Sequence, residues 1–293
     1  MLIKAVLFDL DNTLYDYDTA HKRALAAAYD TAKKDISMPQ TRFRRLYRLA
    51  REGIHRELAG TASAHNRTLY FQRLLEKAGR PTDPELILRL SGVYWDELLR
   101  HVNPYPGVRE TLRFCRDNGI QTAIVSDLTT EIQLRKLEKL GISDLIDVFV
   151  TSEEAGSEKP HAIMFLLTLN KLGVTPQNAI MVGDNTIADI EGANFVGLTT
   201  VLLKRGSLSR IAKEAYQKPD FTIQNIGDVP GVIGDINLKR VTEEGYIKFD
   251  CHFTKTRPIA ASKISQINTY RQKLYDAGLV GAYPNKIGYG NIS

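Results

Sequence analysis

The chain has 293 residues, of which 43% are hydrophobic and 25% charged, a composition typical of a folded protein with a sizeable core and room for two domains. No stretch approaches the roughly 18 consecutive apolar residues that span a bilayer, and the two cysteines lack metal-binding or framework spacing. The sequence therefore argues against a membrane protein, a disulfide scaffold and a structural zinc site. With a modest net charge of +5 and a first apolar run too short for a signal peptide, we expect a cytoplasmic protein.

The first predicted element is a buried strand over residues 3–8, which ends abruptly in two carboxylates, Asp9 and Asp11. Ligands of open α/β sheets gather at the carboxyl ends of such strands. The i, i+2 spacing lets both carboxylates reach one substrate, so that one could act as nucleophile while the other moves protons. The simpler alternative is that the two aspartates only begin a solvated turn.

Residues 15–103 follow with a helical pattern, which is interrupted by breakers at Pro39, 60–63 and 79–84. This segment carries the whole charge excess of the chain, with 16 Lys/Arg against 11 Asp/Glu. Within residues 42–56, apolar positions at helical spacing lie beside an arginine stripe of Arg44, Arg48 and Arg51. The stripe is either a solvated helix face or a positive surface that draws an anionic substrate to a site. No groove-reading motif accompanies it, so a nucleic-acid partner is not expected.

From residue 104 onward, strands and helices alternate in the βαβ rhythm of an α/β doubly wound parallel sheet. The expected strands cover residues 120–125, 148–151, 179–183 and 199–203, with a last short strand between 219 and 226. The expected helices cover residues 108–118, 129–140, 161–172 and 187–195. Because the helical segment falls between the first strand and the rest of the sheet, we predict that it is inserted over the strand ends as a cap.

Four short motifs in the chain resemble those of the haloacid dehalogenase (HAD) superfamily. They are an apolar strand followed by DxDxT, a strand that closes in a hydroxyl residue, a Lys-Pro pair before a helix, and GDxxxxD followed by xxGA. The residues that match them are, in order, Asp9, Asp11 and Thr13; Ser126; Lys159; and Asp184 and Asp189. The last motif is the most specific of the four.

The resemblance implies a HAD-like Rossmannoid core at residues 1–14 and 104–233 and an α-helical C1-type cap at residues 15–103. It also implies that Asp9 attacks phosphorus to form an aspartyl phosphate, while Asp11 protonates the leaving alkoxide and then activates water. Ser126 would bond a phosphoryl oxygen. Lys159 would neutralise charge on both the nucleophile and the phosphoryl group.

A metal ion is expected because a phosphoester dianion repels an anionic nucleophile. Mg²⁺ accepts carboxylates, waters and phosphate oxygens as ligands, so Asp9 and Asp184 suit it. Zinc would instead favour a set of His and Cys ligands. By resemblance, Asp11 adds its backbone carbonyl to the metal, and Asp189 holds metal-bound waters or orients Lys159. A simpler interpretation of Asp189 is an acid at a helix N-terminus, where the helix dipole favours it.

These residues predict a Mg²⁺-dependent phosphatase, a phosphoric monoester hydrolase that acts on a small phosphorylated metabolite such as a sugar phosphate or nucleoside monophosphate. The presence of Asp11 argues against a dehalogenase, because the family members that attack carbon lack this second aspartate. A phosphomutase or phosphotransferase stays open, since the same site can pass phosphate to a sugar hydroxyl. Substrate choice is expected to belong to the cap, where the candidate contacts are His21, Arg44, Arg48, His65, Arg67 and Tyr70.

The core is expected to end near residue 233, which leaves a C-terminal extension at residues 234–293. We expect a strand over residues 245–253 and a helix over residues 262–277. The last thirty residues or so resemble the opening of class II aldolase (adducin-like) domains, but His252 is the only histidine of the extension, so aldolase activity is not expected in it. Three interpretations of the extension stay open. It is part of a phosphatase–aldolase fusion, or it forms a homo-oligomer contact. In the third, the whole chain is a non-catalytic regulatory module attached to an aldolase.

Overall fold

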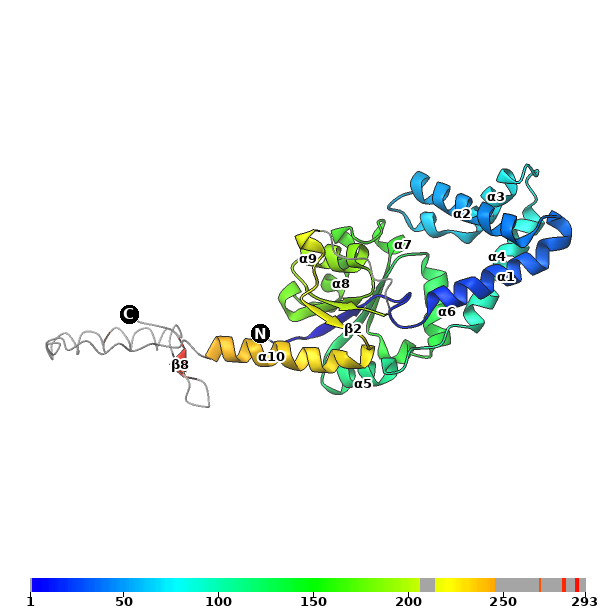
Figure 1. Cartoon of the computed structure of the whole chain (residues 1–293). Coiled ribbons are helices and arrows are strands. Elements are labelled where there is room, and N and C mark those ends of the chain that lie inside the picture. Colours follow the sequence, from blue (N-terminus) through cyan, green and yellow to red (C-terminus); the bar gives the residue numbers. More distant parts are fainter. Residues whose placement is uncertain (1, 206–213, 246–268, 270–280, 283–287, 290–293) are drawn as a thin grey trace. The chain divides into compact units, whose positions relative to one another are not determined.

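The computed structural model describes residues 2–205, 214–245, 269, 281–282 and 288–289 (Figure 1). The chain divides into two compact units, Met1–Asp235 and Ile236–Ser293. In the second unit, β7 (Gly281–Ala282) pairs antiparallel with β8 (Gly288–Tyr289). The strand and the helix expected in the extension, like its aldolase-like ending and Cys251, lie almost wholly outside the described residues.

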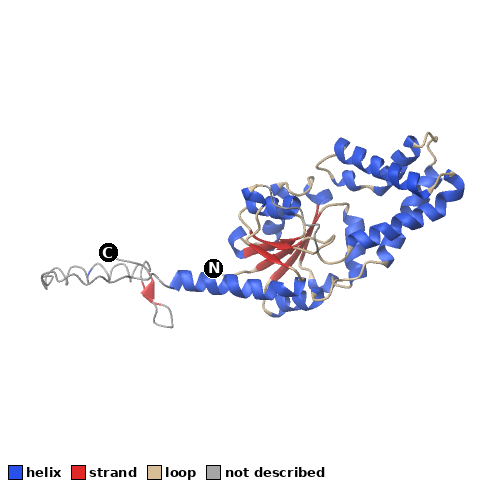
Figure 2. Cartoon of the chain, in the orientation of Figure 1, coloured by secondary structure: helices blue, strands red, loops and turns tan. Residues whose placement is uncertain are grey.

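The first unit is built on a parallel sheet of six described strands in the order β3-β2-β1-β4-β5-β6, which confirms the predicted fold class. The strands are β1 (Ala5–Phe8), β2 (Gln121–Ser126), β3 (Val148–Thr151), β4 (Ala179–Gly183), β5 (Thr199–Leu203) and β6 (Phe221–Ile223). Every residue of β1 and β4 is buried, as expected of parallel strands with both faces covered by helices (Figure 2). β1 begins two residues later than predicted, whereas β3, β4 and β5 have the predicted bounds.

The order of the strands places a topological switch point beside β1. The chain runs outward through β2 and β3 and then returns to the other side of β1 as β4. Phe8 is in register with Ile124 of β2 and with Val182 of β4, and the Asp9 N–H donates to the Val182 carbonyl at 2.9 Å. The residues that follow β1, β2 and β4 therefore meet at one point, which is where open α/β sheets bind ligands.

The helices of the sheet region are α5 (Val108–Asp117), α6 (Thr130–Leu140), α7 (Ser152–Ala155), α8 (Ala162–Leu172) and α9 (Gly192–Phe195). A further helix, α10 (Val229–Gly245), begins in this unit and continues past its end at Asp235. α8 and α9 bury Phe165 and Ala193 against one face of the sheet. A methyl group at Gly192 would overlap the Phe165 ring and the Pro160 backbone, which explains why motif four needs a glycine there. None of the described helices is long and apolar enough to cross a membrane.

Two details of these helices differ from the prediction. The expected helix over residues 187–195 is a π-helical turn, η4 (Thr186–Glu191), followed by the short α9. The helix expected over residues 161–172 starts one residue later, at Ala162, because His161 is its cap and accepts from the Ile163 N–H at 3.3 Å. Both differences lie beside the candidate site, where the backbone is shaped by contacts that a helical pattern does not encode.

Four helices follow β1, namely α1 (Tyr17–Ile36), α2 (Gln40–Glu57), α3 (Arg67–Lys77) and α4 (Pro84–Arg100), with a 3-10 turn, η1 (Ala62–His65). The predicted breakers coincide with the connections between them. Asp16, Asn66 and Asp83 cap three of these helices by accepting hydrogen bonds from backbone N–H groups of the first turn. On α2, the apolar positions are buried and the arginine stripe is exposed, as the amphipathic pattern predicts.

Candidate active site

Asp9 lies at the carboxyl end of β1, where two side chains hold its buried carboxylate. The Thr13 hydroxyl donates to Oδ2 at 2.8 Å, and the Lys159 ammonium donates to Oδ1 at 2.6 Å. Burial raises the pKa of Asp9 to about 6, although the attraction of Lys159 opposes the shift. Asn12 turns the chain back beside this carboxylate with φ 67°, a left-handed conformation that asparagine tolerates.

Lys159 joins Asp9 to a second buried carboxylate, that of Asp189. Its ammonium donates to Asp189 Oδ1 at 2.7 Å, and the other oxygen of Asp189 accepts from the Asn185 N–H at 3.0 Å. The Lys159 ammonium thus lies between the carboxylates of Asp9 and Asp189. A methyl group at Gly183 would overlap the Asp189 carboxylate, so the glycine before Asp184 makes room for this arrangement.

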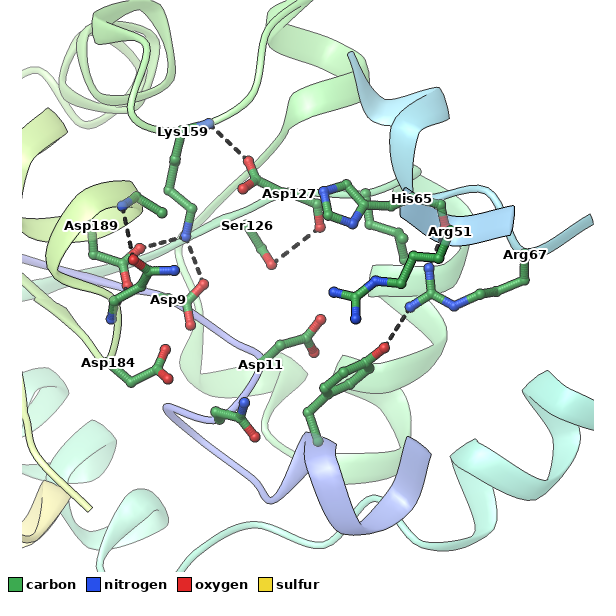
Figure 3. Close-up of a pocket in the computed structure, with 15 residues that line it drawn as sticks. Asp9, Asp11, Arg51, His65, Arg67, Ser126, Asp127, Lys159, Asp184 and Asp189 are labelled. Atoms are coloured by element: carbon green, nitrogen blue, oxygen red, sulfur yellow. Dashed lines mark hydrogen bonds and ion pairs between the residues drawn. The ribbon is translucent and has the colours of Figure 1, made fainter. Parts of the chain in front are cut away.

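Asp184 completes a cluster of three carboxylates at the ends of β1 and β4 (Figure 3). One oxygen from each of Asp9, Asp184 and Asp189 lies within 4.8 Å of the other two. Burial, together with repulsion from Asp9 and Asp189, raises the pKa of Asp184 to about 8. The Lys159 ammonium pairs with Asp9 and Asp189 and with no oxygen of Asp184, so the ionised cluster has an excess of negative charge that a divalent cation would balance. A donor set made only of carboxylate oxygens suits a hard divalent cation, the class to which Mg²⁺ belongs, better than it suits zinc.

The Asp11 carboxylate is not part of this cluster and instead contacts Lys136 of α6. The Lys136 ammonium donates to both carboxylate oxygens at 2.8 Å, and the Tyr15 hydroxyl donates to Oδ1 at 2.5 Å. Burial alone would raise the pKa of Asp11, but the Lys136 charge and these hydrogen bonds lower it below its usual value. The Lys136 ammonium also lies 5.5 to 5.9 Å from the ring centres of Tyr15, Tyr17 and Trp95.

The sequence motifs did not predict Lys136 as a site residue, because it belongs to none of the four. Its side chain is only 1% exposed, and it lies on the core face of α6 with Ile132 and Leu140. A lysine at a core position of an amphipathic helix is rare unless it is paired. That position is the signal that would have identified Lys136 as a candidate.

The last residue of β2, Ser126, and the first two residues of the loop after it, Asp127 and Leu128, line the site. The buried Ser126 hydroxyl accepts from the Gln133 side-chain amide at 2.6 Å, and Asp127 Oδ1 accepts from the Lys159 N–H at 2.9 Å. Leu128 has φ 112°, a strained conformation for a bulky residue. The Ser152 hydroxyl stabilises it by accepting a hydrogen bond from the Leu128 N–H at 2.9 Å. The loop is therefore fixed against both the Lys159 segment and α6.

These residues form one wall of a pocket of about 190 Å³, and the helices after β1 form the opposite wall (Figure 3). The lining residues from those helices and from η1 are Tyr17, Arg51, His65 and Arg67. Of the six substrate contacts proposed from the sequence, the structure thus brings His65 and Arg67 to the pocket. The other four, which the pocket lining does not include, are His21, Arg44, Arg48 and Tyr70.

Comparison with known proteins assigns the fold and the site to a family. The haloacid dehalogenase-like hydrolase family matches residues 3–197, and the chain belongs to this family. Ribulose-1,5-bisphosphate 5-phosphatase of Halopiger xanaduensis is 39% identical over 78% of this chain and 98% of its own length. Glyceraldehyde 3-phosphate phosphatase of Methanopyrus kandleri is 31% identical over 80% of this chain and 99% of its own length.

Solved structures agree with this assignment. A HAD phosphatase from Thermococcus onnurineus superposes with a TM-score of 0.62 at 26% identity, over 79% of this chain and 98% of that one. The predicted HAD-like fold and the predicted class of enzyme, a phosphoric monoester hydrolase, are confirmed.

Proposed function

We propose that this chain hydrolyses small phosphorylated metabolites, sugar phosphates in particular, with Mg²⁺ and through an aspartyl phosphate on Asp9. The observation that carries the proposal is the meeting of Asp9, Lys159 and Asp184 at the switch point of the sheet. Sugar phosphates are favoured because the phosphatases from Halopiger and Methanopyrus are named for phosphorylated sugars. In this proposal, α1 to α4 act as the cap that covers the site.

The first chemical step forms the covalent intermediate. An Asp9 oxygen attacks phosphorus as the bond from phosphorus to the leaving alkoxide breaks, and Asp11 gives the alkoxide its proton. Ser126 and Lys159 hold the phosphoryl oxygens. Mg²⁺ held by Asp9, Asp184 and Asp189 would supply positive charge where the two anions meet. Because Lys136 favours the ionised form of Asp11, this acid step requires Asp11 to take up a proton before the alkoxide leaves.

The second step releases phosphate. Asp11, now ionised, takes a proton from a water molecule whose oxygen attacks phosphorus, and the bond between phosphorus and the Asp9 oxygen breaks. The products are inorganic phosphate and the free Asp9 carboxylate. The contacts with Lys136 and Tyr15 stabilise the ionised form of Asp11 that this step needs.

The role of Asp11 leads to a prediction that depends on the leaving group. We expect Asp11→Asn to lower kcat for a sugar phosphate by about 10²- to 10⁴-fold, because the alkoxide then lacks its acid and the water its base. With p-nitrophenyl phosphate, whose leaving group needs no proton, the first step should survive and the second should not. Stopped-flow absorbance should then show a burst of p-nitrophenolate close to one equivalent per enzyme, followed by slow turnover. The absence of a burst, with equal losses for both substrates, would contradict this role.

Metal removal provides a second prediction. We expect EDTA to abolish phosphate release and Mg²⁺ to restore it. Asp184→Asn should raise the Mg²⁺ concentration for half-maximal activity by about tenfold or more, because it removes one carboxylate of the cluster. The matched control is Asp144→Asn, whose side chain is 70% exposed and lies outside the pocket. Full activity of the EDTA-treated enzyme would refute the metal requirement.

The experiment that tests the proposal as a whole is a substrate panel. Phosphate release by the full chain is measured with sugar phosphates, nucleoside monophosphates and short phosphorylated acids, with Mg²⁺ present or chelated. We expect the highest kcat/KM among the sugar phosphates. Product analysis by phosphorus NMR separates a phosphatase, which yields inorganic phosphate, from a phosphomutase, which yields an isomeric ester.

A further inference from the structure

The wall of the pocket opposite Asp9 carries two arginines, Arg51 and Arg67, for which the described part of the chain provides no carboxylate partner. Arg67 is only 6% exposed, and its guanidinium donates to neutral oxygens. These acceptors are the Tyr17 hydroxyl at 2.5 Å, the Tyr94 hydroxyl at 3.3 Å and the His65 carbonyl. Its charge is therefore held in place without a described carboxylate in direct contact, although it helps to lower the pKa of Asp11, and this is a costly state for a buried cation.

Arg73, by contrast, shows that an arginine on these helices can have carboxylate partners. Arg73, which is half-buried on α3, pairs with Glu57 at 2.7 Å and with Glu76 at 3.0 Å. Arg67 begins the same helix but faces the pocket instead. Two tyrosine rings and one tryptophan ring lie against it, and its guanidinium carbon lies 5.1 to 5.5 Å from the ring centres of Tyr70, Tyr94 and Trp95.

Figure 3 shows how the charges are divided across the pocket. The three carboxylates of the cluster and Lys159 lie on one side, while Arg51 and Arg67 point into the pocket from the other. Arg51 comes from the last two turns of α2 and Arg67 from the first residue of α3, so two helices bring their positive charge to one place. At about 190 Å³, the pocket has room for one small molecule between the two ends.

We propose that Arg51 and Arg67 form a second anion subsite, and that the preferred substrates are small phosphoesters with a further phosphate or carboxylate at the end away from the cleaved bond. This inference rests on the proposed function. Arginine donates two parallel hydrogen bonds to either anion, and such charge-assisted bonds are about twice as strong as neutral ones. A substrate with an uncharged far end would leave the buried Arg67 charge without a counter-ion.

Two matched substrate pairs test the subsite in the full chain with Mg²⁺. The first pair is ribulose bisphosphate and the corresponding ribulose monophosphate; the second is phosphoglycolate and hydroxyethyl phosphate. We expect kcat/KM to be higher for the doubly anionic member of at least one pair, by about tenfold to a hundredfold. A preference in the first pair identifies a phosphate as the second anion, and one in the second pair identifies a carboxylate.

Substitutions then connect the preference to the two arginines. Arg51→Gln, on an exposed side chain, and Arg67→Gln should each reduce the ratio of kcat/KM within the preferred pair by about tenfold or more. Arg67→Lys keeps the charge and should retain part of the ratio, which separates lost binding from misfolding. The matched control is Arg48→Gln, one turn earlier on α2, where the side chain faces Glu52 at 3.9 Å and does not line the pocket.

Equal kcat/KM within both pairs for the wild-type enzyme would overturn the second subsite, as would a preference that survives both Gln substitutions. In either case, phosphate release that depends on Asp9 would leave the proposed phosphatase function intact. If no phosphoester of either pair or of the wider panel releases phosphate, the proposed function fails and the subsite fails with it.

Discussion

Asp9→Asn is expected to abolish phosphate release, with a loss in kcat on the order of 10⁴- to 10⁶-fold, as for the removal of other covalent nucleophiles. The amide is a far weaker nucleophile than the carboxylate and cannot form the acyl phosphate. It keeps the shape of the side chain and one oxygen for the bond from Lys159. The measurement is phosphate release under single-turnover and steady-state conditions, with Asp117→Asn, on the exposed face of α5, as the surface control.

The same variant is expected to keep its stability, which separates the loss of a nucleophile from unfolding. Burial raises the pKa of Asp9 to about 6, so at neutral pH the ionised carboxylate costs the folded metal-free protein more free energy than it costs the unfolded chain. A neutral amide removes that penalty, and Tm in EDTA should stay the same or rise. A variant that lost activity together with a large fall in Tm would not support the nucleophile assignment.

Lys159→Met is expected to have the second-largest effect, because it affects both activity and stability. The Lys159 side chain is 3% exposed and neutralises two carboxylates, Asp9 and Asp189, that are themselves 9% and 1% exposed. Removing one member of a buried ionic network costs about 3–5 kcal/mol of the free energy of unfolding. The loss of its charge near the phosphoryl group should also lower kcat by about 10²- to 10³-fold.

Urea unfolding in EDTA measures the stability part of this prediction. The control is Lys171→Met, which breaks a partly exposed pair with Glu154 and should cost less than about 1 kcal/mol. Addition of Mg²⁺ should recover part of the stability of Lys159→Met, since the cation would supply positive charge to the same carboxylates. Equal stability of the two variants would contradict the network described for Lys159.

The sequence was sufficient to predict those parts of the site that depend on local pattern. Asp9 and Asp184 directly follow apolar strands and Ser126 ends one, and the carboxyl ends of neighbouring parallel strands meet whatever the details of packing. The pairing of Lys136 with Asp11 was not predictable in this way, because the two residues are 125 positions apart and meet only through the packing of α6. The π-helical turn at Thr186–Glu191 likewise depends on tertiary contacts.

The arginine stripe of α2 shows the same limit on the side of the substrate. Helical spacing places Arg44, Arg48 and Arg51 on one face, but the rise of 1.5 Å per residue separates the first from the last by about 10 Å along the axis. The pocket lies only beside the last turns of the helix, so Arg51 reaches it and the other two do not. Periodicity thus predicted which face is positive, and the tertiary structure decided which of its charges can meet a substrate.

Chemical trapping of the intermediate tests the central claim most directly. Borohydride reduces an acyl phosphate to an alcohol, so an enzyme quenched during turnover of p-nitrophenyl phosphate, whose leaving group needs no acid, would carry homoserine in place of the phosphorylated aspartate. Asp11→Asn is the variant to use, because its slow second step should let the intermediate accumulate. We predict homoserine at position 9 in peptide mass spectra, only when substrate is present. Homoserine at another aspartate, or none under conditions that give a p-nitrophenolate burst, would contradict the assignment of Asp9 as the nucleophile.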